Sequence, residues 1–476
     1  MRRMSVRQPV RPEPVEGPTP AQLLALIARM EHGLLERGAA VRLALLAALA
    51  GEHILLIGPP GTAKSALARR LQHAFADARW FERLLTRFSV PEELFGPLSL
   101  KALEHDRYER LTDGYLPTAG VAFLDEVFKA NSAILNALLT LLNEREFDNG
   151  AGRVRTPLVC VVGATNEVPQ EESLQAFHDR FLLRVPVSAV GDAAFDALLE
   201  LHDDAAPVAV PLERAAVQAL QRRAADTVVL GDDARAALHA LRAWTSAEGI
   251  TVSDRRWRQL ARLLRVQAAS GGRGQVTALD LWLVPYVVAE RPEHVERVAA
   301  WWLDHALTAP PADAPWLARA VAAFEKQLEM EVQLQQDEGE AGKLALARSI
   351  GMTTREEGAM TRLVSETLEA KLRKKVSPVH VQARLAQIDE IGVPLAQRRA
   401  GVAAGLAALE ASMRDHLWLA PELQRALARR WHDPLQLLQA LAARLEAVRE
   451  GFAELPIDPA LAGDVAPEPV RLDAAA

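Results

Sequence analysis

Apolar residues change their spacing along the chain, and each change predicts a different kind of structure. Between Thr19 and Leu49 they recur at intervals of three and four residues, which is typical of helices. Short, uninterrupted apolar runs follow and predict strands buried on both faces, namely His53–Ile57, Leu84–Phe88, Val121–Leu124, Leu158–Val162 and Phe181–Val187. Helical patterns lie between several of these runs, the clearest at Ala130–Asn143. Strand alternating with helix predicts an α/β fold, in which a parallel sheet carries helices on both faces.

Strand patterns stop after about Gly191, and only helical patterns follow. We therefore expect the α/β domain over 20–190, an all-helical domain over 191–305 and a mostly helical region over 306–455. The two ends, 1–19 and 456–476, are rich in proline and offer little to bury, so both are predicted to be flexible tails.

Composition narrows the class of protein without identifying it. The net charge of −7 argues against a protein whose main function is to bind the phosphates of nucleic acids. The single cysteine, Cys160, cannot form an internal disulfide and is expected to be a buried small apolar residue. The chain shows no apolar run long enough to span a membrane, no signal peptide and no zinc-ligand spacing. A cytoplasmic location is expected.

A glycine- and proline-rich loop follows the first predicted strand and opens a helix. Its sequence is Gly58-Pro59-Pro60-Gly61-Thr62-Ala63-Lys64-Ser65. Backbone amides in such a loop turn around an anion, Lys64 can reach the β- and γ-phosphates of a nucleotide, and the Ser65 hydroxyl can bind Mg²⁺. Ala63 stands where the strict pattern has glycine. A plain turn between strand and helix is the alternative.

Two later strands end in polar residues that complete this chemistry. The run beginning at Val121 ends in Asp125 and Glu126, suited to hold Mg²⁺ and to activate water, respectively. The next strand leads to Asn166. Because neighbouring parallel strands end at the same edge of a sheet, Asn166 is predicted to lie beside Glu126 and to orient the attacking water.

These motifs resemble the AAA+ superfamily and, within it, the MoxR family, with the RavA branch the most similar. Three sequence motifs carry the resemblance. They are the loop Gly58–Ser65, Phe123-Leu124-Asp125-Glu126 with Lys129-Ala130-Asn131 after it, and Gly163-Ala164-Thr165-Asn166-Glu167. It covers about residues 20–300. The resemblance implies an ATP hydrolase that uses Mg²⁺ and forms a ring, most often a hexamer, with nucleotide between subunits.

The same resemblance assigns two arginines. Arg180, in Asp179-Arg180-Phe181, corresponds to the arginine finger that reaches a neighbour's γ-phosphate, and Arg184 is a competing candidate. Arg255 corresponds to the lid arginine placed over the phosphates, with Arg256 as the alternative.

The resemblance also implies a client-remodelling or chaperone-like role with a von Willebrand A domain protein. The sequence between 306 and 476 shows no strand-rich pattern of the kind expected for the insertion by which the RavA branch binds a lysine decarboxylase. A different, helical partner-binding module is therefore expected over 306–455. The segment Phe88–Pro117 and the turn Phe147–Gly150 are candidates for loops that face the pore of a ring. An AAA+ nucleic-acid motor of helicase or restriction type is the alternative function.

Overall fold

The computed structural model describes residues 16–150, 152–169, 171–202, 206–305, 315–349, 375–414, 416–461 and 466–470. The chain forms two compact units. The first comprises Met1–Thr308 and Arg414–Leu423, and the second comprises Ala309–Met413 and Gln424–Ala476. The tail predicted over 1–19 lies outside the described residues as far as residue 15.

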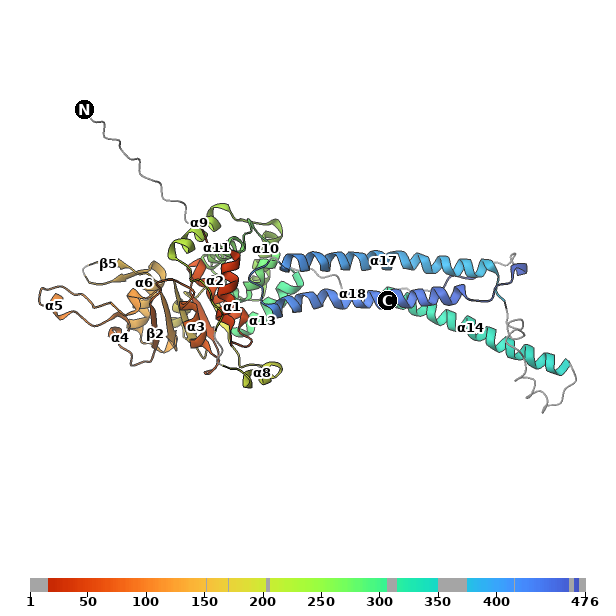
Figure 1. Ribbon diagram of the computed structural model, residues 1–476, viewed down its shortest axis with the longest axis horizontal. Coiled ribbons are helices and arrows are strands. Elements are labelled where there is room, and N and C mark those ends of the chain that lie inside the picture. The colour runs from red at the N-terminus through yellow and green to blue at the C-terminus, as the bar shows by residue number, and fades with distance from the viewer. Residues whose placement is uncertain are drawn as a thin grey trace, which may run out of the picture. The chain divides into compact units, whose positions relative to one another are not determined.

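A five-stranded parallel sheet forms the centre of the first unit, in the order β2-β3-β6-β1-β7 (Figure 1). The strands are β1 (Ile54–Ile57), β2 (Trp80–Leu84), β3 (Val121–Asp125), β6 (Cys160–Thr165) and β7 (Leu183–Pro186). β1, β3 and β6 are buried almost throughout, because strands inside a parallel sheet are covered on both faces. The predicted α/β class is confirmed.

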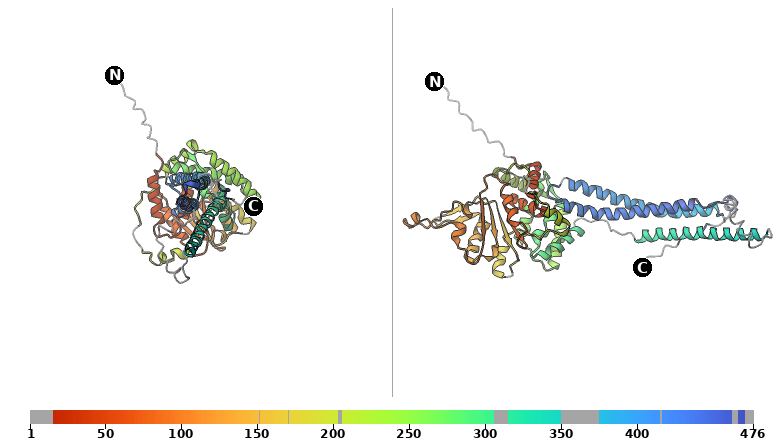
Figure 2. Two further views of the ribbon diagram at one scale, coloured as in Figure 1. Left: turned by 90° about the vertical axis from the view of Figure 1, so that its right-hand side faces the viewer. Right: turned by 60° about the horizontal axis from the view of Figure 1, so that its bottom comes forward.

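Helices cover both faces of this sheet (Figure 2). On one face, alternate strand residues such as Leu55, Ala122 and Val161 pack with α4 (Pro91–Phe95), α6 (Ser132–Glu144) and α7 (Glu172–His178). On the other, α2 (Gly38–Ala50) contacts β1, β6 and β7, and α3 (Lys64–Gln72) contacts β3, with α1 (Pro20–Glu31) packed on both helices. Because all five strands are parallel, their carboxyl ends lie together at one edge of the sheet, which we call the carboxyl edge.

The second strand was predicted at the wrong position. The apolar run Leu84–Phe88 suggested a strand, whereas β2 occupies Trp80–Leu84. β2 lies at the border of the sheet and has polar residues such as Glu82 and Arg83 among its apolar ones, so it lacks a continuous apolar run.

Two hairpin-like excursions leave the sheet. β4 (Glu146–Asp148) and β5 (Arg153–Arg155) pair antiparallel, as the predicted turn at Phe147–Gly150 requires. The insert Phe88–Pro117 contains α4, the short α5 (Leu100–Leu103) and the start of η1 (Leu116–Thr118), with an isolated bridge between Leu98 and Arg110.

The helical domain follows β7. It contains η3 (Asp192–Ala194), α8 (Phe195–Leu199), α9 (Arg214–Thr227), α10 (Asp232–Ala247), α11 (Asp254–Ser270), η4 (Ala278–Leu283), α12 (Pro285–Val288) and α13 (Pro292–His305). The expectation that strands cease after Gly191 was wrong in one detail, since β8 (Val229–Leu230) pairs with β9 (Gln275–Val276). Two-residue strands produce no readable apolar pattern.

Residues 414–423 belong to the first unit because they are anchored in the helical domain. His416 donates to the buried Asp280 over 3.0 Å, and the Trp418 indole donates to Ser270 over 2.8 Å. Burial alone would raise the pKa of Asp280, but hydrogen bonds from Arg273 and His416 lower it below its ordinary value. The buried carboxylate is therefore fully paired.

The described part of the second unit is built on the long helices α14 (Pro315–Ser349), α17 (Pro378–Arg414) and α18 (Pro421–Ala453). The predicted apolar face of α18, Leu438, Leu441, Leu445 and Val448, is confirmed as part of their shared core. The tail predicted from Pro456 differs in the structure: Ile457 pairs with Val376, and Val470 packs on the core. No helix among the described residues could span a membrane.

Candidate nucleotide-binding site

The loop between β1 and α3 is shaped by two glycines. Gly58 leaves β1 with its Cα pressed against the backbone of Val187, where a Cβ would collide with the carbonyl oxygen of that residue. Gly61 has φ +80°, a left-handed conformation that favours glycine. The loop is closed by the Thr62 hydroxyl, which donates to the carbonyl of Pro59 over 2.9 Å.

Ala63 adopts a left-handed conformation, with φ +64° and ψ +23°, directly before α3. This backbone explains why the strict motif has glycine at the position, since a side chain there carries strain. Alanine still permits the turn that opens the helix at Lys64. The sequence departure therefore preserves the shape of the loop.

Lys64 is folded over the loop that precedes it. Its ammonium group donates to the carbonyl oxygens of Gly58 and Pro59 over 2.7 and 2.8 Å. Burial lowers the pKa of Lys64, an effect opposed by the carboxylates of Asp125 and Glu126. The lysine is thus held at the mouth of the loop and within the field of both acids.

The predicted acidic pair and asparagine come together at the carboxyl edge of β3 and β6. The Asn166 amide donates to Glu126 over 2.6 Å, so the predicted proximity of these side chains is found. Asp125 accepts a hydrogen bond from the Glu126 amide over 3.0 Å. Glu126 has φ +51°, a strained conformation for a residue with a side chain, and such strain is concentrated at functional sites.

Two further residues at this edge were given no role in the sequence analysis. Lys129 lies 3.3 Å from the second carboxylate oxygen of Glu126, a contact that their three-residue spacing could have suggested. Arg37 donates to the carbonyls of Thr62 and Ser188 and so ties the loop to the segment after β7. Nothing in the sequence around Arg37 marks this role.

The candidate arginines fall into two groups. Arg184 and Arg256 are 5% and 3% exposed, respectively, and both pair with Asp179. Arg256 also donates to the carbonyls of Phe181, Leu182 and Val287, so its guanidinium is bound within its own chain. Arg184 donates to Ala289 in the same way. Neither is free to reach a second chain.

Arg180 and Arg255 lie at the other edge of the sheet. Arg180 precedes β7, and Arg255 lies in the first turn of α11 and donates to Asn143 at the end of α6 over 3.0 Å. Both line a cleft with Glu52 and His53, which precede β1. Lys64 follows β1, so the structure separates Arg255 from its own loop by the length of that strand. Within one chain Arg255 therefore does not lie over the phosphate loop, and its role as a phosphate contact stays a prediction.

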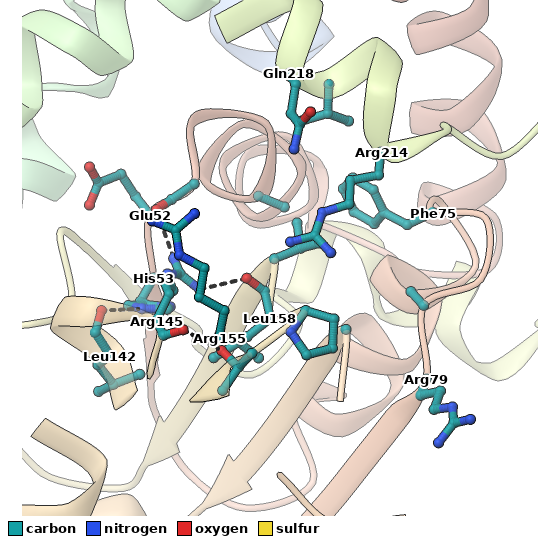
Figure 3. A pocket seen from close by; sticks show the side chains of 18 of the residues that line it. Glu52, His53, Phe75, Arg79, Leu142, Arg145, Arg155, Leu158, Arg214 and Gln218 are labelled. Carbon is teal, nitrogen blue, oxygen red and sulfur yellow. Dashed lines mark hydrogen bonds between the residues drawn. The ribbon is translucent and has the colours of Figure 1, made fainter. Parts of the chain in front are cut away.

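This cleft lies at the edge formed by the amino ends of the strands, which we call the amino edge. It has a volume of about 1290 Å³ and is rich in arginine (Figure 3). Its base is rigid: Arg145 donates to the carbonyls of Gly51 and Leu158, and His53 joins Leu142 to Val161. Burial holds the pKa of His53 well below its ordinary value, so its ring is neutral.

The carboxyl edge fits a nucleotide with Mg²⁺. Among the described residues, the amides of Gly61 and Ala63 donate to no protein acceptor, as expected for donors kept for phosphate oxygens. Ser65 is exposed at the first turn of α3, and Asp125 lies at the end of β3. Few protein ligands are needed here, because Mg²⁺ in such sites is bound by one or two side chains together with phosphates and water.

Comparisons with known proteins agree with this geometry. A profile for the MoxR domain in the MoxR-vWA-beta-propeller ternary systems matches residues 21–219, and an AAA lid domain profile matches 235–302. Two uncharacterized proteins of Methanocaldococcus jannaschii are each 39% identical, over 56% and 53% of this chain and 70% and 66% of their own lengths.

The protein MoxR of Paracoccus denitrificans is 28% identical over 31% of this chain and 45% of its own length. The MoxR domain profile covers the part of the chain that contains the loop, the acidic pair and Asn166, and the lid profile covers the helical domain from α10 to α13. The chain belongs to the MoxR family of AAA+ ATPases.

Proposed function

We propose that this protein is a Mg²⁺-dependent ATPase that works as a ring and remodels or activates a protein partner. One observation carries the chemistry: Asn166 donates to Glu126 over 2.6 Å at the edge where Lys64 closes the phosphate loop. A carboxylate held by an amide beside a phosphate loop is the arrangement that aligns a water for attack on a γ-phosphate.

Each residue at this edge has a separate task. The backbone amides of Gly61–Ser65 and the Lys64 ammonium bind the β- and γ-phosphates, and Ser65 and Asp125 would hold Mg²⁺. The bound ion would neutralise charge on the phosphates. Glu126 accepts the proton of the attacking water, and Asn166 keeps the Glu126 carboxylate and that water in line.

Arg180 and Arg255 act on the nucleotide of a neighbouring subunit. Both lie at the amino edge, and their own loop lies beyond β1 at the opposite edge. A head-to-tail ring brings opposite edges of successive subunits together, which supports an arginine supplied in trans. Arg180 is then the finger and Arg255 a second phosphate contact. A hexamer is the ring size we expect from the AAA+ class.

The partner is proposed to be a von Willebrand A domain protein. The matching profile describes MoxR domains from systems that contain such a protein together with a β-propeller, which supports this choice over a nucleic-acid motor. Placement in the RavA branch, a chaperone-like role and a cytoplasmic location stay predictions. The helices of the second unit are the expected partner-binding module.

The decisive experiment separates the loop from the fold. Lys64→Ala should abolish ATP binding in calorimetry, because the cation on the β- and γ-phosphates is lost. Lys101→Ala, on the exposed α5, serves as the matched control and should bind ATP normally. Tight ATP binding by Lys64→Ala would contradict the assignment.

The partner is tested with a trapped enzyme. Glu126→Gln should bind ATP without turning it over and so retain its partner during purification from the native cell. We expect a von Willebrand A domain protein that is recovered with ATP and lost without it. Its absence from such material would contradict this part of the proposal.

A further inference from the structure

The cleft at the amino edge contains more positive charge than Arg180 and Arg255 account for. Besides these two, Arg155, Arg214 and Arg262 line it and are exposed. Among the described residues, none of the five forms a salt bridge within 4.0 Å, although Arg262 and Arg255 act on the buried Glu52 in the cleft. Asp77 and Glu213 also line the cleft, so arginines outnumber acids there without being its only charges. Figure 3 shows the side chains of Arg155 and Arg214 reaching toward the same space, while Arg79 points away. Unpaired guanidinium groups in one concavity favour an anionic occupant.

The cleft also offers apolar surface and considerable size. Val154, which is 57% exposed, supplies this apolar surface, and the largely buried Phe75, Leu158 and Leu212 also line the cleft. Its volume of about 1290 Å³ exceeds the roughly 300–1,000 Å³ of pockets that hold small molecules. A polypeptide segment that is both acidic and apolar therefore fits the cleft better than a nucleotide alone.

The chain itself carries such a segment. Asp192, Asp196 and Glu200 follow one another at four-residue intervals, in η3, in α8 and directly after α8, respectively. Like charges at this spacing repel each other, and none of the three is paired with a cation among the described residues. Phe195 and Leu199 on the same segment are 51% and 70% exposed.

This segment has little to hold it within its own chain. No residue of η3 or α8 is buried. A five-residue helix is not stable in water without packing, and exposed apolar side chains beside charges mark a site of association. In Figure 1 α8 projects from the body of the domain. The segment is therefore suited to insertion into a partner.

Its position excludes the cleft of the same chain. The segment follows β7 at the carboxyl edge, where the Gly191 amide donates to Glu36 and the Ser188 carbonyl accepts from Arg37. Arg37 also contacts the phosphate loop through the carbonyl of Thr62. The acidic segment thus lies beside the nucleotide edge, and the arginine cleft lies at the opposite edge of the same sheet.

We infer that the acidic segment 192–201 of one subunit docks in the arginine cleft of the next. This contact is heterologous, because it joins two different surfaces of identical chains, and its repetition closes a ring. It rests on the proposed ring ATPase and adds to it a contact made by Arg155, Arg214 and Arg262, apart from the residues that handle ATP. The carboxylates replace the missing partners of the arginines, and Phe195 and Leu199 meet the apolar lining.

Charge reversal on either side tests the pairing in the full-length protein. The cleft variant is Arg155→Glu/Arg214→Glu, and the helix variant is Asp196→Arg/Glu200→Arg. Each alone places like charges opposite each other and should raise the subunit dissociation constant in Mg-ATP by about 100-fold. Sedimentation velocity at two salt concentrations measures it. The matched control, Arg235→Glu/Arg242→Glu on α10, carries the same charge change away from the cleft and should assemble normally.

Mixing the two variants gives the sharpest result. In a mixed ring the reversed cleft of one subunit meets the reversed helix of the next, and the remaining contacts are of wild-type sign. Two proteins that are each monomeric should therefore assemble together. Calorimetry on each variant should show unchanged ATP affinity, because the phosphate loop is untouched.

Several outcomes would overturn the pairing and each identifies a different cause. Wild-type protein that stays monomeric in Mg-ATP would defeat both this contact and the proposed ring. Rings that form normally in both variants, or a mixture that fails to assemble although each variant binds ATP, would defeat the contact alone. A cleft variant that assembles normally but loses binding of inorganic tripolyphosphate would show that the cleft receives a free anion instead.

Discussion

The two edges of the central sheet carry opposite chemistry, although the same strands form both. At the carboxyl edge the charged groups are satisfied within the chain: Lys64 donates to the loop carbonyls, and Glu126 accepts from Asn166. At the amino edge Arg180 and Arg255 have no carboxylate partner among the described residues. The carboxyl edge can therefore hold a nucleotide with groups of its own chain. The amino edge instead has guanidinium groups that are available to a ligand supplied by a second chain.

Burial makes the same distinction between neighbouring arginines. Arg255 and Arg256 are adjacent in sequence, yet Arg255 is exposed and Arg256 is 3% exposed and bound to three backbone carbonyls. A guanidinium that is already saturated has a structural task, and one left with free donors at a cleft has a binding task. This difference yields predictions that affect each edge separately.

The largest effect is expected at the amino edge. Arg180→Ala should leave ATP binding intact and reduce turnover by about 10³–10⁵-fold, the range for an arginine that stabilises the transferring phosphoryl group. Mixing Arg180→Ala with Lys64→Ala should restore part of the activity, since each supplies the edge that the other lacks. Steady-state ATPase assays on oligomers verified by mass measurement check this.

The mixing experiment also tests whether Arg180 acts on the nucleotide of a neighbouring subunit. If mixed oligomers form and no activity returns, Arg180 does not act in trans. Arg184 would not replace it without a rearrangement, because its guanidinium is buried against Asp179 and Ala289.

At the carboxyl edge, Glu126→Gln should lower turnover by roughly 100-fold or more while ATP affinity is retained. The amide keeps the shape and the contact with Asn166 but cannot accept the proton of water. Calorimetry and single-turnover hydrolysis separate binding from chemistry. Near-normal turnover would remove Glu126 from the proposed mechanism.

The sequence predicts the carboxyl edge better than the amino edge, for physical reasons. Buried strands such as β1 and β6 have continuous apolar runs, and the polar residues at their ends follow from strand order. The border strand β2 has no such run and was predicted four residues too late. The arginines of the cleft come from segments far apart in sequence, Arg155 from β5 and Arg214 from α9. No sequence motif therefore predicts that they lie together.

Which arginine is buried could not be predicted either. Arg180 precedes β7 and Arg184 lies within it, and the contacts with Asp179 and the carbonyl of Ala289 show that Arg184 is enclosed. These contacts depend on the helical domain, which folds against β7 through α12. The local pattern of apolar and polar residues cannot predict these long-range contacts.

A stability measurement sharpens the contrast between the adjacent arginines. Arg256→Met should lower the free energy of unfolding by about 2–3 kcal/mol, because the carbonyls of Phe181, Leu182 and Val287 lose a charged donor in a buried site. Arg255→Met should change it by less than about 0.5 kcal/mol, as is usual for an exposed side chain. Denaturant unfolding checks both, and equal effects would contradict the division between structural and binding arginines.

The smallest effect concerns the phosphate loop itself. Ala63 has φ +64°, and this left-handed conformation costs a residue with a Cβ about 1–2 kcal/mol. Glycine removes that strain but loses about 0.5–1 kcal/mol through the greater freedom of the unfolded chain. Ala63→Gly should therefore raise the free energy of unfolding by about 0.5–1 kcal/mol. Ala66→Gly, three residues later inside α3, should lower it by about 1 kcal/mol, because glycine weakens a helix interior. Opposite signs for the same substitution in denaturant unfolding would establish that the carboxyl edge holds its nucleotide loop in a strained conformation, and equal signs would contradict it.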